Sequence, residues 1–320
     1  MWEKVKKLFA PSDMTVGTPW KKIVAFMIPM LIGNIAQQMY NTVDSIVVGR
    51  YVGDNALAAV GSAGPIFQLL LVLFAGIAVG AGIMVSQYFG AKARDELSET
   101  IGCCITLTIL ASLALMILSP FIVRPLLELL DTPASIIDWC DSYLMILMIG
   151  IGGLAFYNIL SGILRGMGDS VSALLYLLIA TVMNIVLDIF FVKDLQMGVS
   201  GVALATVIAQ TFSGILCLIR LMKMRDIFDL KLRYLRPKKK YCFSLIRLGI
   251  PSGLTQMILS MAMIVVQSLT NSFGEQFIAA NVIVMRVDGF AMMPNFSFGT
   301  TMTTYAGQNV GARKYDRVYQ

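Results

Sequence analysis

The chain has 320 residues, of which 57% are hydrophobic and only 14% are charged, and it carries a formal net charge of +6. Soluble domains contain about 25% charged residues, so this composition excludes a protein whose whole surface faces water. The chain has no histidine. Proton chemistry is therefore left to carboxylates, and histidine-based zinc motifs are excluded.

Eight long apolar runs follow one another along the chain, at residues 23–48, 56–86, 101–123, 143–164, 171–192, 199–222, 245–271 and 277–306. A helix needs about 20 mostly apolar residues to cross a bilayer, and each run meets that length. We therefore predict an all-α polytopic membrane protein with eight spanning helices. Pro29 lies inside the first run, where it removes a backbone hydrogen bond, so a kink is expected there.

The basic residues predict the orientation of these helices. Of the 25 Lys and Arg residues, 21 fall on one side of the predicted membrane, whereas Arg50, Arg124 and Lys193 fall on the other. The positive-inside rule then places both termini in the cytoplasm. The strongly basic loop between the sixth and seventh helices is expected to fix topology beside lipid headgroups rather than to bind nucleic acid.

The first two predicted helices and the last two carry matching motifs. Residues 53–59 (GDNALAA) match 274–280 (GEQFIAA), and 87–95 (QYFGAKARD) match 308–316 (QNVGARKYD), and the offset along the chain is identical for both matches. The copies are six helices apart, and because six is even they run in the same direction. Such parallel repeats are common in secondary transporters.

The repeat predicts the domain organisation. We expect a first lobe of six helices over residues 1–222, a basic cytoplasmic inter-lobe loop over 223–244, and the first two helices of a second lobe over 245–320. Two complete repeat units would need a considerably longer chain than the 320 residues present. The expectation is a chain truncated after about eight helices, with a natural eight-helix protein as the alternative.

Polar residues recur at helical spacing inside the predicted spans. In the first span, Asn34, Gln37, Gln38 and Asn41 precede Asp44 at spacings of three and four residues, which places them on one face. Similar faces consist of Thr181, Asn184 and Asp188 in the fifth span and of Thr206, Gln210 and Ser213 in the sixth, and the fourth span offers Tyr143, Asn158 and Ser161. Helices facing only lipid would not carry such stripes, so we expect an aqueous cavity or a packed polar core.

Three of these residues are predicted to lie at one depth. Asp44 comes six residues before Arg50 and Asp188 five before Lys193, which puts both carboxylates roughly 7–9 Å inside the outer surface at 1.5 Å per residue. Thr206 reaches a similar depth from the start of the sixth span. Charges inside a membrane are costly and mark functional sites. Two carboxylates with amide and hydroxyl oxygens suit Na⁺, and two crowded carboxylates also suit a proton, so the coupling ion stays open.

The order and spacing of several motifs resemble the MATE (multidrug and toxic compound extrusion) family, in its DinF-like and MepA-like branch. The first-lobe motifs are IPMLIGNIAQQMYNTVDSIVVGRYVG, QYFGAKARDE, LRGMGDS, NIVLDIFF and GVSGVALATVIAQ, and the second-lobe motifs are GIPSGLTQ and GQNVGARKYDR. The resemblance implies a fold of two six-helix lobes in a multi-pass protein of a prokaryotic plasma membrane. It implies a monomer when full length and no organic cofactor.

The resemblance also implies roles for particular residues. The family's first-lobe cation site matches Asp44, Asn184, Asp188 and Thr206, its supporting network matches Tyr143 and Asn158, and its drug cavity matches Gln37, Ser161 and Thr181. Gln38 and Asn41 join the cavity through the polar face described above. Gln256 stands where the NorM-like branch has an acidic residue, which argues against a second cation site of that type.

The function implied is a secondary antiporter that exports amphipathic, mostly cationic drugs in exchange for Na⁺ or H⁺. One alternative is a lipid-linked oligosaccharide flippase of the same superfamily, which would favour a cationic cavity, whereas Asp44 and Asp188 are acidic. Another is an inactive truncated fragment. An intramembrane enzyme is not expected, because no nucleophile–base pair or metal motif is present.

Overall fold

The computed structural model describes residues 11–130, 132–271 and 275–319. Their helices are α2 (Pro19–Tyr51), α3 (Asp54–Gly90), α4 (Arg94–Leu129), α5 (Ile137–Ile149), α6 (Ile151–Gly166), α7 (Ser170–Ile189), η1 (Phe190–Asp194), α8 (Gly198–Met222), η2 (Leu232–Leu235), α9 (Lys239–Asn271), α10 (Glu275–Gly311) and α11 (Tyr315–Tyr319). No strand occurs in the described ranges. The all-α fold is confirmed, and each of the eight predicted apolar runs lies within helical segments.

Five of the described helices are long and apolar enough to cross a membrane, and seven spans result if two bent pairs each count as one. These spans identify a multi-pass membrane protein. The described part of α10 is helical but is not among these candidates. The eighth predicted span therefore exists as a helix, although its membrane-spanning role stays a prediction.

The fourth predicted span is not one straight helix. It divides into α5 and α6, which meet at 55°. Glycines at the junction explain the bend: a Cβ on Gly150 would overlap the side chain of Val207, and one on Gly153 would overlap Thr211. Both obstructing residues belong to α8, so the small residues let α8 pack directly against the break.

The predicted repeat recurs in the helix boundaries. Helices α2 and α9 both have 33 residues, and α3 and α10 both have 37. Helices α3 and α10 are each followed by a residue with positive φ, Lys92 at 55° and Arg313 at 58°. These two residues occupy equivalent positions in the matched motifs. Gly274, which belongs to one of the matched motifs, lies outside the described residues. The lobe boundaries themselves stay a prediction.

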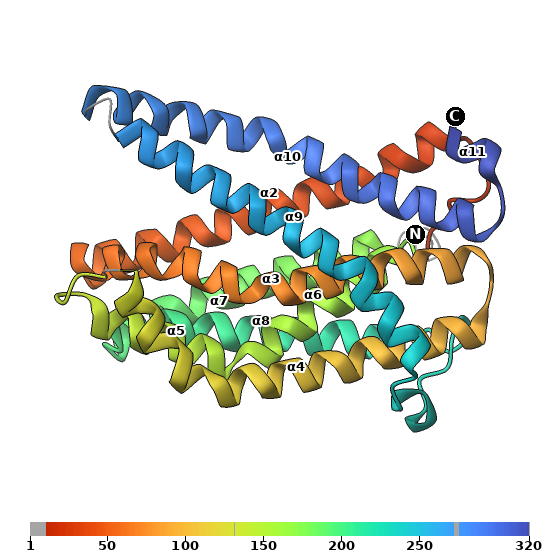
Figure 1. The fold of residues 1–320 in the computed structure, drawn as a ribbon, viewed down its shortest axis with the longest axis horizontal. Coiled ribbons are helices and arrows are strands. Elements are labelled where there is room, and N and C mark those ends of the chain that lie inside the picture. The colour runs from red at the N-terminus through yellow and green to blue at the C-terminus, as the bar shows by residue number, and fades with distance from the viewer. Residues whose placement is uncertain (1–10, 131, 272–274, 320) are drawn as a thin grey trace.

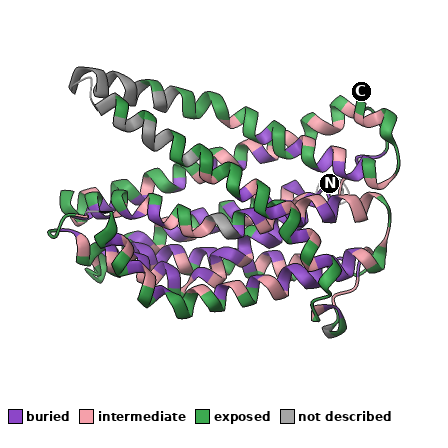
Figure 2. Cartoon of the chain, in the orientation of Figure 1, coloured by how far each residue is buried: buried purple, intermediate pink, exposed green. Residues whose placement is uncertain are grey.

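Helices α2 to α8 form a bundle, and the α9–α10 pair lies across it (Figure 1). The pair converges on the bundle near the two chain termini and diverges from it toward the C-terminal part of α9 and the N-terminal part of α10. Buried residues concentrate inside the bundle, whereas much of the described surface of α9 and α10 is exposed (Figure 2).

Glycines bring α3 and α9 into close contact. A Cβ on Gly76 would lie 2.6 Å from the carbonyl oxygen of Gly249, and a Cβ on Gly249 would lie 2.7 Å from that of Gly76. Nearer the termini, α3 meets α10 in the same reciprocal way, because a Cβ on Gly90 would overlap Gln308 and one on Gly311 would overlap Gln87. The α9–α10 pair is therefore held to the bundle by backbone-to-backbone approach at the end where the termini lie.

Candidate cation site and its family

Two carboxylates from different helices meet inside the bundle. Asp44 on α2 is 8% exposed and Asp188 on α7 is fully buried. Their carboxyl groups lie within hydrogen-bonding reach of each other. Asn184 lies one turn before Asp188 and is fully buried. With its amide assigned in the orientation that lets it donate, the nitrogen lies 2.9 Å from Asp44 Oδ1 and 3.3 Å from Asp188 Oδ2. The structure thus brings together three of the four residues predicted for the cation site.

The fourth predicted residue, Thr206, connects to this cluster through a tyrosine. The hydroxyl of Tyr40 donates to Thr206 Oγ1 at 2.9 Å, and the Tyr40 ring is buried. Asp44 and Asp188 are both close enough to Tyr40 to interact with its hydroxyl electrostatically. Tyr40 is absent from the predicted site. Its position one turn before Asp44, on the same face of α2, is the signal that could have revealed it.

The cluster is short of positive partners. Among the described residues, Asp188 Oδ1 is buried without a hydrogen-bond partner, and no ion pair involves either carboxylate. Two adjacent carboxylates in a dry setting repel each other, so one must hold a proton or a cation must lie beside them. The described residues contain no group of three or more His, Cys, Asp or Glu arranged for a metal.

The predicted supporting residues divide into two groups. Tyr143 packs partly buried against the bundle core and lies near Asp44 and Asp188. Asn158 does not join the cluster: it is exposed, and its amide donates to the carbonyl of Leu154 at 2.8 Å. Tyr143 lies on α5 and Asn158 on α6, on either side of the 55° bend between these helices.

The residues predicted to line a ligand cavity lie on three helices. On α2, Gln37 is half-buried, and Gln38 and Asn41 are exposed. Thr181 on α7 and Ser161 on α6 are buried, and each hydroxyl donates to a carbonyl of its own helix. Their role in ligand binding stays a prediction.

Helix α2 also contacts the α9–α10 pair. The amide of Asn34 donates to Ser297 Oγ on α10 at 2.8 Å, and Ser297 is fully buried. Asn34 and Asp44 are ten residues apart on one continuous helix. Helix α2 therefore carries both Asp44 and the contact with α10.

The family is decided by a model that matches residues 29–190 and 251–320 under the description MatE. The chain belongs to the MatE family. Asp44, Asn184 and Asp188 all fall inside the matched ranges. The interruption at 191–250 contains α8 and the basic loop before α9.

Named MatE relatives agree with this assignment. The chain is 32% identical to "Probable multidrug resistance protein YoeA" of Bacillus subtilis, over 94% of this chain and 66% of that protein. It is 30% identical to "Probable multidrug resistance protein YpnP" of the same organism, over 96% of this chain and 68% of that one. A solved structure titled "Outward-facing conformation of a multidrug resistance MATE family transporter of the MOP superfamily" superposes with a TM-score of 0.88 at 29% identity, over 96% of this chain and 68% of that one.

The chain therefore spans about two thirds of the length of the relatives that it matches. The matching portion includes the bundle that holds Asp44 and Asp188 together with the α9–α10 pair. The MATE-type fold predicted from the motifs is confirmed.

Proposed function

We propose that this protein is a secondary antiporter that exports amphipathic, mostly cationic compounds in exchange for Na⁺ or H⁺. Its setting is the plasma membrane of a prokaryote, with both termini in the cytoplasm. The observation that carries the proposal is the buried meeting of Asp44, Asn184 and Asp188 within a MatE chain. Relatives named as multidrug resistance proteins support the substrate class.

Cation binding would neutralise the carboxylate pair. With a proton or Na⁺ present, the repulsion between Asp44 and Asp188 is relieved and the helices α2 and α7 can pack closely. Without it, the repulsion favours separation of these helices or entry of a positively charged compound. The ion and a cationic drug thus compete for one negative region, which is the thermodynamic requirement for exchange.

Helix α2 would transmit the change. It carries Asp44 and also Asn34, whose amide donates a hydrogen bond to α10. Pro29 lies on the N-terminal side of both residues, where it removes one backbone hydrogen bond of the helix. An ion that alters the packing of α2 therefore alters its contact with the α9–α10 pair. In an alternating-access cycle that contact would be broken and remade.

A lipid-linked oligosaccharide flippase remains the second candidate. A pyrophosphate group would be repelled by the acidic cluster at Asp44 and Asp188, which favours the drug exporter. No organic cofactor is required by either mechanism.

Accumulation of ethidium in an efflux-deficient bacterium tests the proposal. Cells expressing the protein from its gene should accumulate less ethidium than cells with an empty vector, and Asp44→Asn or Asp188→Asn should abolish the difference. Asp54→Asn, an exposed aspartate at the start of α3, is the matched control and should pump normally. Normal pumping by both site variants would refute the cation site, and no effect on any amphipathic cation would favour the flippase.

A further inference from the structure

Two cysteines meet where the start of α9 packs against the start of α4, at the end of the bundle near the two chain termini (Figure 1). Cys103 on α4 is buried, Cys242 on α9 is partly exposed, and both are free thiols. Their side chains lie within hydrogen-bonding reach of each other. A bond between these two sulfurs would join the bundle to the α9–α10 pair.

An ion pair one helical turn earlier sets the register of this contact. Lys238 Nζ donates to Oε1 of the buried Glu99, across 139 residues of sequence. Cys103 follows Glu99 by four residues, and Cys242 follows Lys238 by four, with its backbone N–H donating to the Lys238 carbonyl at 3.1 Å. Residues four apart lie on the same face of a helix. The ion pair and the thiol pair therefore form successive layers between α4 and the start of α9.

The segment before α9 is fixed on α4 by backbone contacts as well. A Cβ on Gly102 would overlap the carbonyl oxygen of Tyr234, so this segment lies directly against α4 beside Cys103. Thr106, one turn later, donates from Oγ1 to the carbonyl of Leu235 at 2.6 Å. A disulfide needs its two sulfurs at about 2.05 Å. Since both backbones are already held together, rotation of the side chains should supply most of that approach.

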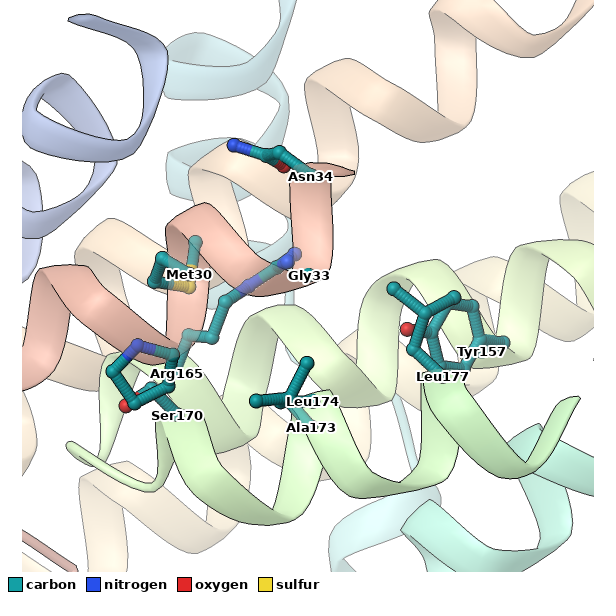
Figure 3. Close-up of a pocket in the computed structure, with 10 residues that line it drawn as sticks. Met30, Gly33, Asn34, Tyr157, Arg165, Ser170, Ala173, Leu174 and Leu177 are labelled. Carbon is teal, nitrogen blue, oxygen red and sulfur yellow. The ribbon is translucent and has the colours of Figure 1, made fainter. Parts of the chain in front are cut away.

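The other three cysteines are arranged differently. Cys140 donates to the carbonyl of Ala59 at 3.4 Å. Cys217 lies near Arg165, which borders a cavity of about 40 Å³ between α2, α6 and α7 (Figure 3). None of the described residues that line this cavity is a cysteine. Cys104 is buried and follows Cys103 directly, so its side chain points about 100° away around α4.

We propose that Cys103 and Cys242 are a site of reversible oxidation by hydroperoxides, at which an intrachain disulfide joins α4 to α9. Hydrogen peroxide oxidises the partly exposed Cys242 to a sulfenic acid and is itself reduced to water. The Cys103 sulfur then attacks the Cys242 sulfur, the S–S bond forms, and the hydroxyl group leaves with the proton of Cys103 as a second water. A dithiol reverses the reaction by exchange and becomes a disulfide itself.

The site goes beyond the proposed export of drugs, and its chemistry requires no transport. In the proposed orientation this end of the bundle faces the cytoplasm, where thiols stay reduced until an oxidant appears. Oxidation would then hold the start of α9 on α4 by a covalent bond in place of the ion pair and packing alone.

Peroxide treatment of the purified protein in detergent tests the site. After treatment and denaturation, the number of thiols that react with a maleimide should fall by two of the five, and dithiothreitol should restore both. Peptide mapping without reductant should recover one linked pair of peptides, which contain Cys103 and Cys242. No covalent dimer should appear on a non-reducing gel.

Single variants separate the roles of the two thiols. In Cys103→Ala, Cys242 lacks a thiol to resolve it and should accumulate a sulfenic acid that dimedone labels. In Cys242→Ala, the buried Cys103 should stay reduced and take no dimedone. Cys217→Ala is the matched control and should form the disulfide as the unaltered protein does.

Three results would overturn the proposal: survival of all five thiols after treatment, a link through Cys104 in place of Cys103, or a covalent dimer through Cys242. If an alanine variant fails to fold, peptide mapping of the unaltered protein decides the question. Because none of these measurements depends on transport, failure of the proposed export function would leave their outcome unchanged.

Discussion

The crossing of α3 and α9 should not tolerate a single added methyl group. Gly76→Ala would place Cβ 2.6 Å from the carbonyl oxygen of Gly249, whereas ordinary van der Waals contact begins at 3.4 Å. The helices must therefore separate locally by the difference between these two distances, because a backbone oxygen cannot rotate away. Overpacking typically costs about 1–3 kcal/mol, which outweighs the roughly 0.5–1 kcal/mol that alanine gains over glycine in a helix.

Thermal unfolding in detergent, followed by tryptophan fluorescence, measures this loss. Each kcal/mol corresponds to about 2–4 °C in Tm for soluble domains of 150–250 residues, so Gly76→Ala should lower Tm by several degrees. Gly61→Ala on the same helix is the control. A Cβ there meets nothing within 4 Å, so its Tm should stay the same or rise.

A double-mutant cycle tests the reciprocal geometry. Once Gly76→Ala has separated the helices, Gly249→Ala should cost less than it does alone, since neighbouring sites are not additive. The reasoning is refuted if Gly76→Ala is as stable as Gly61→Ala, or if the two crossing variants are strictly additive.

Three further predictions concern named polar contacts. Asp169→Asn breaks a buried ion pair with Arg220, so the free energy of unfolding should fall by about 3 kcal/mol in chemical denaturation. Tyr40→Phe removes the hydrogen bond to Thr206 and should cost about 0.5–1.5 kcal/mol in the same assay. Burial raises the pKa of Asp13. Hydrogen bonds from a neighbouring threonine and the positive charges of two nearby lysines lower it by more than burial raises it, so the pKa lies below its ordinary value. The stability that the charged Asp13 carboxylate contributes is present above the unfolded-state pKa and is lost as pH falls through the folded-state pKa. Asp13→Asn should therefore lower Tm at neutral pH, and in strong acid its Tm should match that of the unaltered protein.

Exposed positions supply the controls for these three variants. Asp54→Asn serves both aspartates and Tyr51→Phe serves the tyrosine, and each should change the free energy of unfolding by no more than about 0.5 kcal/mol. An Asp169→Asn variant no less stable than Asp54→Asn would contradict the buried ion pair. A Tm difference for Asp13→Asn that persists in strong acid would contradict the assigned direction of its pKa.

The sequence predicted most of the fold because hydropathy and repetition are local signals. Apolar runs of about 20 residues can only be helices in a bilayer, and the offset between the matched motifs reappears in the boundaries of α3 and α10. The break at Gly150 could not be predicted, because it depends on how closely Val207 and Thr211 of α8 approach. Such an approach is a tertiary contact that leaves no periodicity in the sequence.

The site was predictable where depth alone decides which residues meet. Asp44 and Asp188 were placed at one level by their distance from the nearest basic residues, and the structure brings them together. Asn158 was predicted from the family resemblance rather than from depth, and in the structure its amide donates to its own helix, at the carbonyl of Leu154.

Ion binding by the purified protein is the most direct test of the central claim, that Asp44 and Asp188 hold the coupling cation. Radiolabelled Na⁺ and proton uptake, measured with a soluble pH indicator, should be determined together on the unaltered protein and on Asp188→Asn. The account predicts saturable binding of one of the two ions to the unaltered protein, and the other ion should compete if both use the carboxylates. This binding should be lost in Asp188→Asn and unchanged in Asp54→Asn. Unchanged Na⁺ binding and unchanged proton uptake in Asp188→Asn would contradict it.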